Sequence, residues 1–172
     1  TTVALTPPPE PKLVPPDADA ARALAAEAIA RAEATIERAS SFSEEDLQRG
    51  VDGEWSTVQS LRHLVLVVDV WLSRTILGEE DPFHPMALPP HFMPPKMPGT
   101  SIDPDAAPSF AEACEALRGR FDILRTYTNA VVDEALRVHI NNHAKTVGGG
   151  LGVLFDEFAA HDYFMNRDLD KL

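Results

Sequence analysis

Residues 53–72 read GEWSTVQSLRHLVLVVDVWL, a polar start followed by a nearly continuous apolar run. Ser56 is a suitable N-cap for a helix, and Gln59, three residues later, completes a capping box. The apolar run continues to about Leu77, and Gly78 supplies a C-cap. A helix that is apolar on most of its sides is covered by other elements. The stretch therefore predicts the central helix of an all-α protein.

Three further helical patterns surround this one. Asp17 opens an Ala-, Glu- and Arg-rich stretch over 17–40, Ser109 opens a helix that runs to about residue 132, and a last helix begins around Val147. A short connecting helix is expected in SEEDL at 43–47. With four long helices and no convincing pair of strands, the fold class is an all-α four-helix bundle.

Proline concentrates in two segments, which sets the domain organisation. Residues 1–16 are expected to form an extended arm, and residues 17–172 a single bundle domain. Residues 79–108 carry nine of the 15 prolines and are predicted to cross irregularly from the second helix to the third. A segment of this kind is often a lid or binding loop, and a plain surface excursion is the alternative.

Charge and composition exclude several functions. The net charge of −12 argues against a nucleic-acid partner, which Lys and Arg would have to bind. No run approaches the length of a membrane span, and no secretory leader pattern is present, so no membrane partner is expected. The single cysteine, Cys114, is expected to be a partly buried structural thiol and fits a cytoplasmic location.

One set of side chains has the pattern of a metal site. Glu157 and His161 are four positions apart (i, i+4) on the last predicted helix, so both project from one face. His63 interrupts the apolar run of the central helix and is also expected to face inward. Two facing helices can bring such groups to a divalent ion. The alternatives are a hydrogen-bonded core histidine and a solvated Glu–His pair.

Other candidates are weaker. His139 and His143 have the spacing of a helical metal pair, but they lie in a segment that reads as a connector. Two carboxylates near the predicted ligands, Asp69 and Asp156, are candidates for orienting them, and each is alternatively an ordinary paired or solvated side chain. His84 and His91, in the Pro-rich segment, could reach over the mouth of such a site, and a solvent-exposed role is the alternative; Arg62, Arg74 and Arg167 are the nearby basic candidates.

Two motifs resemble the DinB-like superfamily, which includes the mycothiol-dependent maleylpyruvate isomerase. They are GEWSTVQSLRHL at 53–64 and VGGGLGVLFDEFAAHDYFMNRDLDKL at 147–172. The resemblance implies a bundle that binds a divalent metal, such as zinc or nickel, through one His on the second helix and a pair on the fourth. Matched onto this sequence, the ligands are His63, Glu157 and His161, with the Glu-then-His order of the isomerase.

The resemblance also implies a function. A metal-dependent, thiol-linked transferase or isomerase would act on a small electrophile, with mycothiol or a similar low-molecular-weight thiol. The alternative is a non-catalytic bundle that binds metal or a small ligand in a stress response, as a homodimer through exposed helix faces. A third reading is a bundle that has kept the pattern and lost the metal. The sequence assigns no catalytic residue.

Overall fold

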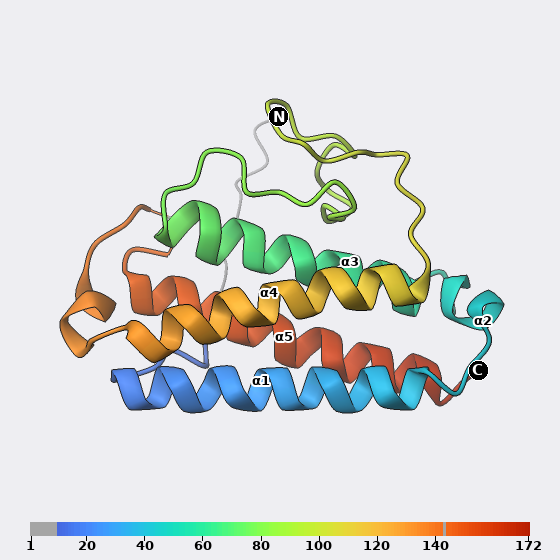
Figure 1. Ribbon diagram of the computed structural model, residues 1–172, viewed down its shortest axis with the longest axis horizontal. Coiled ribbons are helices and arrows are strands. Elements are labelled where there is room, and N and C mark those ends of the chain that lie inside the picture. Colours follow the sequence, from blue (N-terminus) through green and yellow to red (C-terminus); the bar gives the residue numbers. More distant parts are fainter. Residues whose placement is uncertain (1–9, 143) are drawn as a thin grey trace, which may run out of the picture.

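The computed structural model describes residues 10–142 and 144–172, and its long elements are four helices (Figure 1). These are α1 (Ala18–Ala39), α3 (Thr57–Val68), α4 (Phe110–Ala130) and α5 (Val147–Leu169). The short helix α2 (Glu44–Gln48) links α1 to α3, and the 3₁₀ turn η2 (Asp133–Arg137) follows α4. Within the described residues, β pairing is limited to an isolated bridge between His139 and Thr146. The predicted all-α bundle is confirmed.

Polar caps define where these helices begin. Ser56 and Gln59 form a complete capping box at the start of α3, as expected, and Ser109 and Glu112 form another at the start of α4. At α5 the cap is Thr146, whose hydroxyl accepts a hydrogen bond from the Gly149 backbone at 3.0 Å. The caps satisfy N–H groups that would otherwise lack helical partners.

The central helix changes its winding halfway along. Residues Asp69–Ile76 continue α3 as a π-helix, η1, and the backbone of Gly78 takes a positive φ just after it. The expected end near Leu77 is therefore confirmed, whereas the π turns have no signature in the sequence pattern. π turns are often associated with functional sites. Here they leave Asp69 completely buried.

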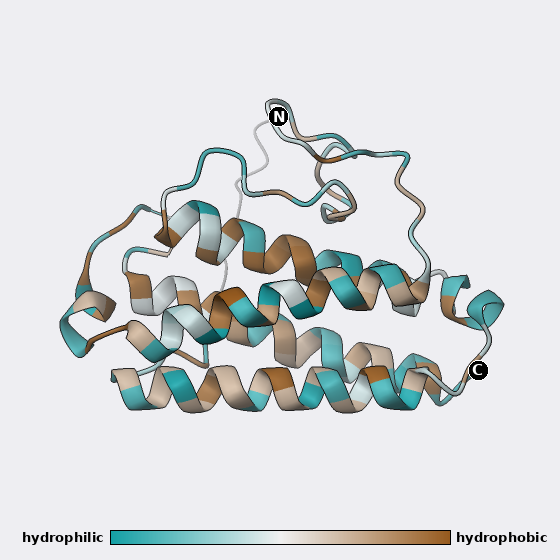
Figure 2. Cartoon of the chain, in the orientation of Figure 1, coloured by the Kyte–Doolittle hydropathy of each residue, from teal (hydrophilic) through white to brown (hydrophobic). Residues whose placement is uncertain are grey.

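The four long helices pack around a shared core. α1 packs against α4 and α5, and α3 packs against the same two helices from the other side. The hydropathy of α1 alternates along its length, because one side faces the core and the other faces solvent (Figure 2). By contrast, eleven of the twelve residues of α3 are buried, which confirms its central place. The largest fully buried side chains include Leu61, Leu64, Leu117, Phe121, Leu151 and Phe155.

The Pro-rich connection between η1 and α4 folds back over α3 (Figure 1). Asp69 holds its first part: the carboxylate accepts hydrogen bonds from the His84 backbone at 2.9 Å and from Arg120 of α4 at 2.8 Å. Arg120 also donates to the Pro82 carbonyl. Phe83 and Ala87 are buried beneath it. The connection is therefore packed onto the bundle at defined points.

Residues 10–16 have no regular secondary structure and contact α5; residues 1–9 of the predicted arm lie outside the described residues. The backbone N–H groups of Lys12 and Leu13 donate to the two carboxylate oxygens of Asp156, at 2.8 and 3.0 Å. A Cβ on Gly152 would lie 2.8 Å from Cγ2 of Val14. The glycine allows the arm to approach the helix, which explains part of the glycine-rich start of α5.

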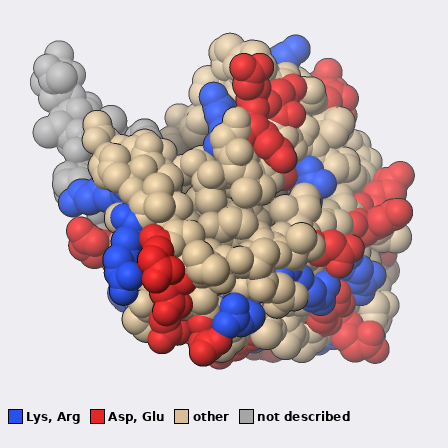
Figure 3. Space-filling view, turned by 60° about the vertical axis from the view of Figure 1, so that its left-hand side comes forward, with Lys and Arg blue, Asp and Glu red and all other residues tan. Residues whose placement is uncertain are grey.

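Acidic and basic side chains are interspersed around a broad uncharged area on the face in Figure 3. Such a face lacks the continuous basic surface that phosphate binding needs, in line with the net charge of −12. Among the described helices, none is long and apolar enough to cross a membrane.

Candidate metal centre

His63 is held rigidly from two directions. It lies on the buried helix α3, and its side chain is 9% exposed. Its Nδ1 atom is 2.9 Å from the carbonyl oxygen of Leu88, in the Pro-rich connection. A carbonyl can only accept a hydrogen bond, so Nδ1 carries a proton, and Nε2 is the nitrogen left to bind an ion. The Nε2 atom is the one that faces α5.

Glu157 and His161 come from adjacent turns of α5 and meet His63 at the α3–α5 contact. The Glu157 Oε2 atom lies 3.2 Å from Nε2 of His161 and 3.7 Å from Nε2 of His63. The exposed fraction of the side chain rises from His63 to His161, at 15%, and then to Glu157, at 40%. The group therefore lies in the wall of the bundle, with its carboxylate at the solvent side.

The three side chains offer one ligand atom each, and these atoms lie within 4.8 Å of one another. Zinc takes nitrogen and oxygen ligands at about 2.0–2.2 Å, so neighbouring ligands of a tetrahedral ion are roughly 3.3–3.6 Å apart. The two distances to Glu157 lie close to this range. Two imidazoles and a carboxylate are also a donor set that suits zinc and nickel. The residues present therefore fit a divalent transition-metal ion.

The charge state of the carboxylate favours metal binding as well. Hydrogen bonds from His161 and His63 lower the pKa of Glu157 to about 2, against the opposing effect of burial. The carboxylate is therefore ionised throughout the neutral range, which is the form that binds a cation. Both Nε2 atoms face the same carboxylate oxygen, at 3.2 Å from His161 and 3.7 Å from His63, so the three groups already lie close together without an ion.

Aromatic rings enclose the set. The Trp55 ring lies 4.7 Å from the His63 ring and 4.8 Å from that of His91, and the Phe164 ring lies 6.0 Å from that of His161. His91 is exposed and comes from the Pro-rich connection, which therefore reaches the mouth of the site as one alternative anticipated. The contact of His63 with the Leu88 carbonyl was not predictable, because no local pattern records which helix a loop covers.

Neither carboxylate considered for orienting the histidines does so. Asp156 accepts from the backbone of the N-terminal arm, and Asp69 pairs with Arg120 and the His84 backbone. Asp69 is paired, as its alternative predicted, whereas Asp156, whose alternative was a solvated side chain, binds the backbone of the arm. Burial raises the pKa of Asp69, while the hydrogen bonds from Arg120 and His84 act in the opposite direction. The orienting partner of His63 is a backbone carbonyl instead.

The other sequence candidates lie apart from the three side chains. His139 is exposed in the bridge with Thr146, and its expected partner in the H-x-x-x-H pattern, His143, lies outside the described residues. Cys114 is more fully buried than predicted, and burial raises the pKa of its thiol to about 11.

The basic candidates are engaged elsewhere. Arg74 lies over the ring of Phe83, and Arg167 pairs with Glu54 and Asp168. Arg62 donates through Nε to the Met86 carbonyl at 2.8 Å.

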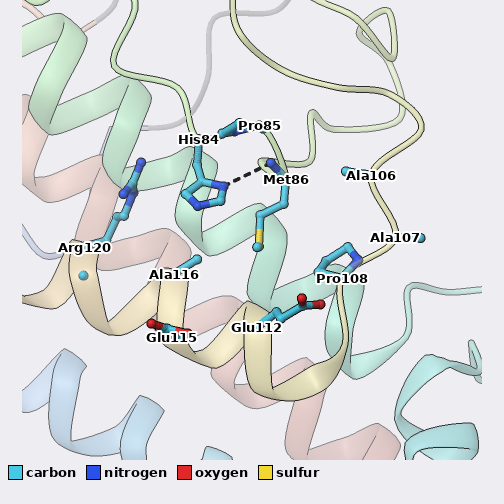
Figure 4. Close-up of a pocket in the computed structure, with 11 residues that line it drawn as sticks. His84, Pro85, Met86, Ala106, Ala107, Pro108, Glu112, Glu115, Ala116 and Arg120 are labelled. Carbon is cyan, nitrogen blue, oxygen red and sulfur yellow. Dashed lines mark hydrogen bonds between the residues drawn. The ribbon is translucent and has the colours of Figure 1, made fainter.

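A cavity of about 680 Å³ opens between α4 and the Pro-rich connection, away from the three candidate ligands (Figure 4). His84 lies there, and its Nδ1 atom accepts a hydrogen bond from the Met86 backbone at 3.1 Å. Burial lowers the pKa of this imidazole. His84 therefore belongs to the anchoring of the connection: of its two alternatives, the reach over the metal site is not observed, and its side chain is partly rather than fully exposed.

Comparison with known proteins identifies the family. Residues 33–165 match the model of the DinB superfamily, a range that includes α3, the Pro-rich connection and all three candidate ligands. The comparison with curated proteins gave no match, and neither did that with solved structures. The matched range covers most of the chain and carries the bundle and its His–Glu–His set together. The chain therefore belongs to the DinB superfamily.

Proposed function

We propose that this protein binds one divalent metal ion, zinc or nickel, through His63, Glu157 and His161. The observation that carries the proposal is the convergence of three ligand atoms from two helices within 4.8 Å. The hydrogen bond from His63 Nδ1 to Leu88 supports it, because metal-binding imidazoles usually donate their other N–H to a fixed acceptor.

We further propose that the metal serves a thiol-linked transferase or isomerase reaction on a small electrophile. Three protein ligands leave a position for a water or thiol, which is typical of catalytic zinc and not of structural zinc. A bound metal lowers the pKa of such a group and so supplies a nucleophile near neutral pH. The chain itself would hold the ion and limit access to it through Trp55 and His91. Mycothiol is the thiol that the isomerase-like ligand order favours.

A non-catalytic metal- or ligand-binding protein is the second candidate. It is favoured by the engagement of Arg74 and Arg167 in other contacts, which leaves few basic groups to bind an anionic thiol beside the ligands. The homodimer expected with this alternative stays a prediction, to be tested by sedimentation of the purified protein.

Elemental analysis of untagged protein, reconstituted with zinc or nickel and then dialysed, tests the metal site. The parent is expected to retain about one ion per chain, and the His63→Ala and His161→Ala variants to lose it. His139→Ala is the matched control, because His139 is exposed and distant in the fold. A parent that retains no metal would refute the site.

The reaction needs a separate assay. The zinc- or nickel-loaded protein is incubated with mycothiol and a small electrophile, and turnover is followed with and without a chelator. Metal-dependent consumption of the thiol supports the enzyme. A protein that holds its metal but shows no turnover with mycothiol or another low-molecular-weight thiol would favour the non-catalytic candidate.

A further inference from the structure

A second, smaller cavity adjoins the candidate metal centre. Its volume is about 220 Å³, and it lies between the start of α3 and the Pro-rich connection. Two of its lining residues also border the metal ligands: the Trp55 ring contacts that of His63, and Leu88 accepts the His63 hydrogen bond. The cavity is smaller than the roughly 300–1,000 Å³ of pockets for drug-sized ligands. It therefore suits a molecule of about one ring.

Arg62 contributes a buried cation to this cavity. The residue is only 9% exposed, and its Nε atom is used by the Met86 carbonyl. Among the described residues, neither Nη atom takes part in a hydrogen bond of the protein. No fully buried side-chain nitrogen in that part of the chain lacks a partner, so each Nη atom keeps some exposed surface, and Arg62 lines the cavity. They are free to bind a ligand.

The electrostatic setting makes an anion the matching ligand. Burial lowers the pKa of Arg62, and the charge of Asp103, which also lines the cavity, partly offsets that effect. Asp103 is exposed and forms no hydrogen bond with the guanidinium in the described structure. A guanidinium with free Nη atoms presents a planar pair of donors that matches a carboxylate. Placing a carboxylate there would compensate the buried charge.

The rest of the lining is mainly apolar. Half-buried Trp55, whose ring lies 4.8 Å from that of His91, contributes with Ala87, Leu88, Met93 and four prolines, and Gln59 and His91 are its other polar members. Aromatic faces bind planar groups by offset stacking. The chemistry of the cavity therefore combines a carboxylate-binding end with a surface for a flat apolar body.

We propose that this cavity binds a small planar carboxylate, with its acid group on Arg62 and its body against Trp55. The Pro-rich connection forms the second wall of the cavity and would therefore determine which acids fit. Binding of the acid in this cavity does not depend on the proposed function. The further step, in which the acid is presented to the metal, rests on the proposed function.

Benzoate is the probe, and Trp55 fluorescence is the readout. Trp71→Phe leaves Trp55 as the only tryptophan, since the chain has two. Benzoate is expected to change the fluorescence saturably, whereas benzamide, which lacks the charge, and acetate, which lacks the ring, bind at least about tenfold more weakly. Equal affinity for benzoate and benzamide would overturn the role of Arg62.

Substitutions at two positions, Arg62 and Asp103, test the electrostatics in opposite directions in this background. Arg62→Gln is expected to weaken benzoate at least about tenfold, and Arg62→Lys to weaken it less, because the charge is kept. Asp103→Asn is expected to tighten benzoate by about two- to tenfold, since it removes a competing negative charge. Asp19→Asn on α1 makes the same charge change away from the cavity and should have no effect. An Asp103→Asn variant that binds no more tightly contradicts the proposal even if Arg62→Gln fails to fold.

Metal-free and zinc-loaded proteins separate this inference from the proposed function. Benzoate should bind the His161→Ala variant, which lacks a proposed metal ligand, within about threefold of its parent. Benzoate binding that is lost without metal but is unchanged by Arg62→Gln would place the carboxylate on the ion. That result would overturn the inference and leave the proposed metal centre intact. Benzoate binding in a protein that takes up no metal would uphold the inference and refute the metal centre.

Discussion

The Nδ1 atom of His63 donates to the carbonyl oxygen of Leu88 across 2.9 Å, which joins a buried helix to a loop 25 residues later in the chain. The contact fixes the imidazole tautomer and turns Nε2 toward Glu157 and His161. A segment without regular structure thereby takes part in building the candidate metal centre. The affinity for metal should depend on how this loop is seated.

Ala87→Leu tests that dependence. Ala87 is 1% exposed, so a larger side chain must lift the loop and move the neighbouring Leu88 carbonyl. Zinc affinity, measured by competition with a chromophoric chelator, is expected to fall about 10–100-fold, the usual cost of losing a group that orients a ligand. Phe92→Ala, in the same loop at a side chain 88% exposed, is the control and should change little. Unchanged affinity in Ala87→Leu would show that the carbonyl is dispensable.

Asp69→Asn should destabilise the protein by about 3–5 kcal/mol, because it leaves Arg120 without its charged partner in a largely buried pair. Urea unfolding measures the change. The surface pair of Arg118 and Glu33 is the comparison, and Glu33→Gln should cost less than about 1 kcal/mol. A cost for Asp69→Asn as small as that of the surface variant would mean that the pair does not hold the loop in place.

Two glycines in helices should respond to alanine in opposite ways. Gly119, inside α4, has open space where a Cβ would stand, so Gly119→Ala should stabilise by up to about 1 kcal/mol. At Gly152 a Cβ would meet Val14 at 2.8 Å and Pro11 at 3.0 Å, so Gly152→Ala should displace the arm. Thermal unfolding and limited proteolysis at residues 10–16 measure the two effects. Equal stabilisation by both substitutions would contradict the described packing of the arm.

The Cys114 thiol should be unreactive in the native protein. With a pKa of about 11, it is ionised on the order of 100-fold less at pH 8 than a free thiol, so alkylation by iodoacetamide should be slower by at least that factor. The unfolded thiol ionises from about pH 8.5, so stability should fall as pH rises from there toward 11. Urea midpoints of the parent and of Cys114→Ala, compared at pH 8 and 10, isolate this contribution. A parent that loses no more stability than the variant would refute it.

Local sequence patterns were sufficient to predict most of the fold. Ser56 with Gln59, and Ser109 with Glu112, mark the starts of α3 and α4 because capping involves residues three apart. The i, i+4 spacing likewise placed Glu157 and His161 on one face. A paired Asp69 was one of the alternatives, but its partners could not be named, because Arg120 and His84 come from a distant helix and a loop. The same reason hid Leu88: a backbone carbonyl leaves no trace in residue type, and proline-rich segments follow no period.

The adjacency of Arg62 and His63 has a thermodynamic consequence. These consecutive residues hold the loop at two carbonyls, those of Met86 and Leu88, one beside the cavity and one beside the metal ligands. A ligand that immobilises the loop at one of these carbonyls reduces the conformational entropy that the loop loses when the second ligand binds. Ion and acid should therefore each raise the other's affinity by the same factor, although neither need touch the other. Two consecutive residues would then couple the two ligands.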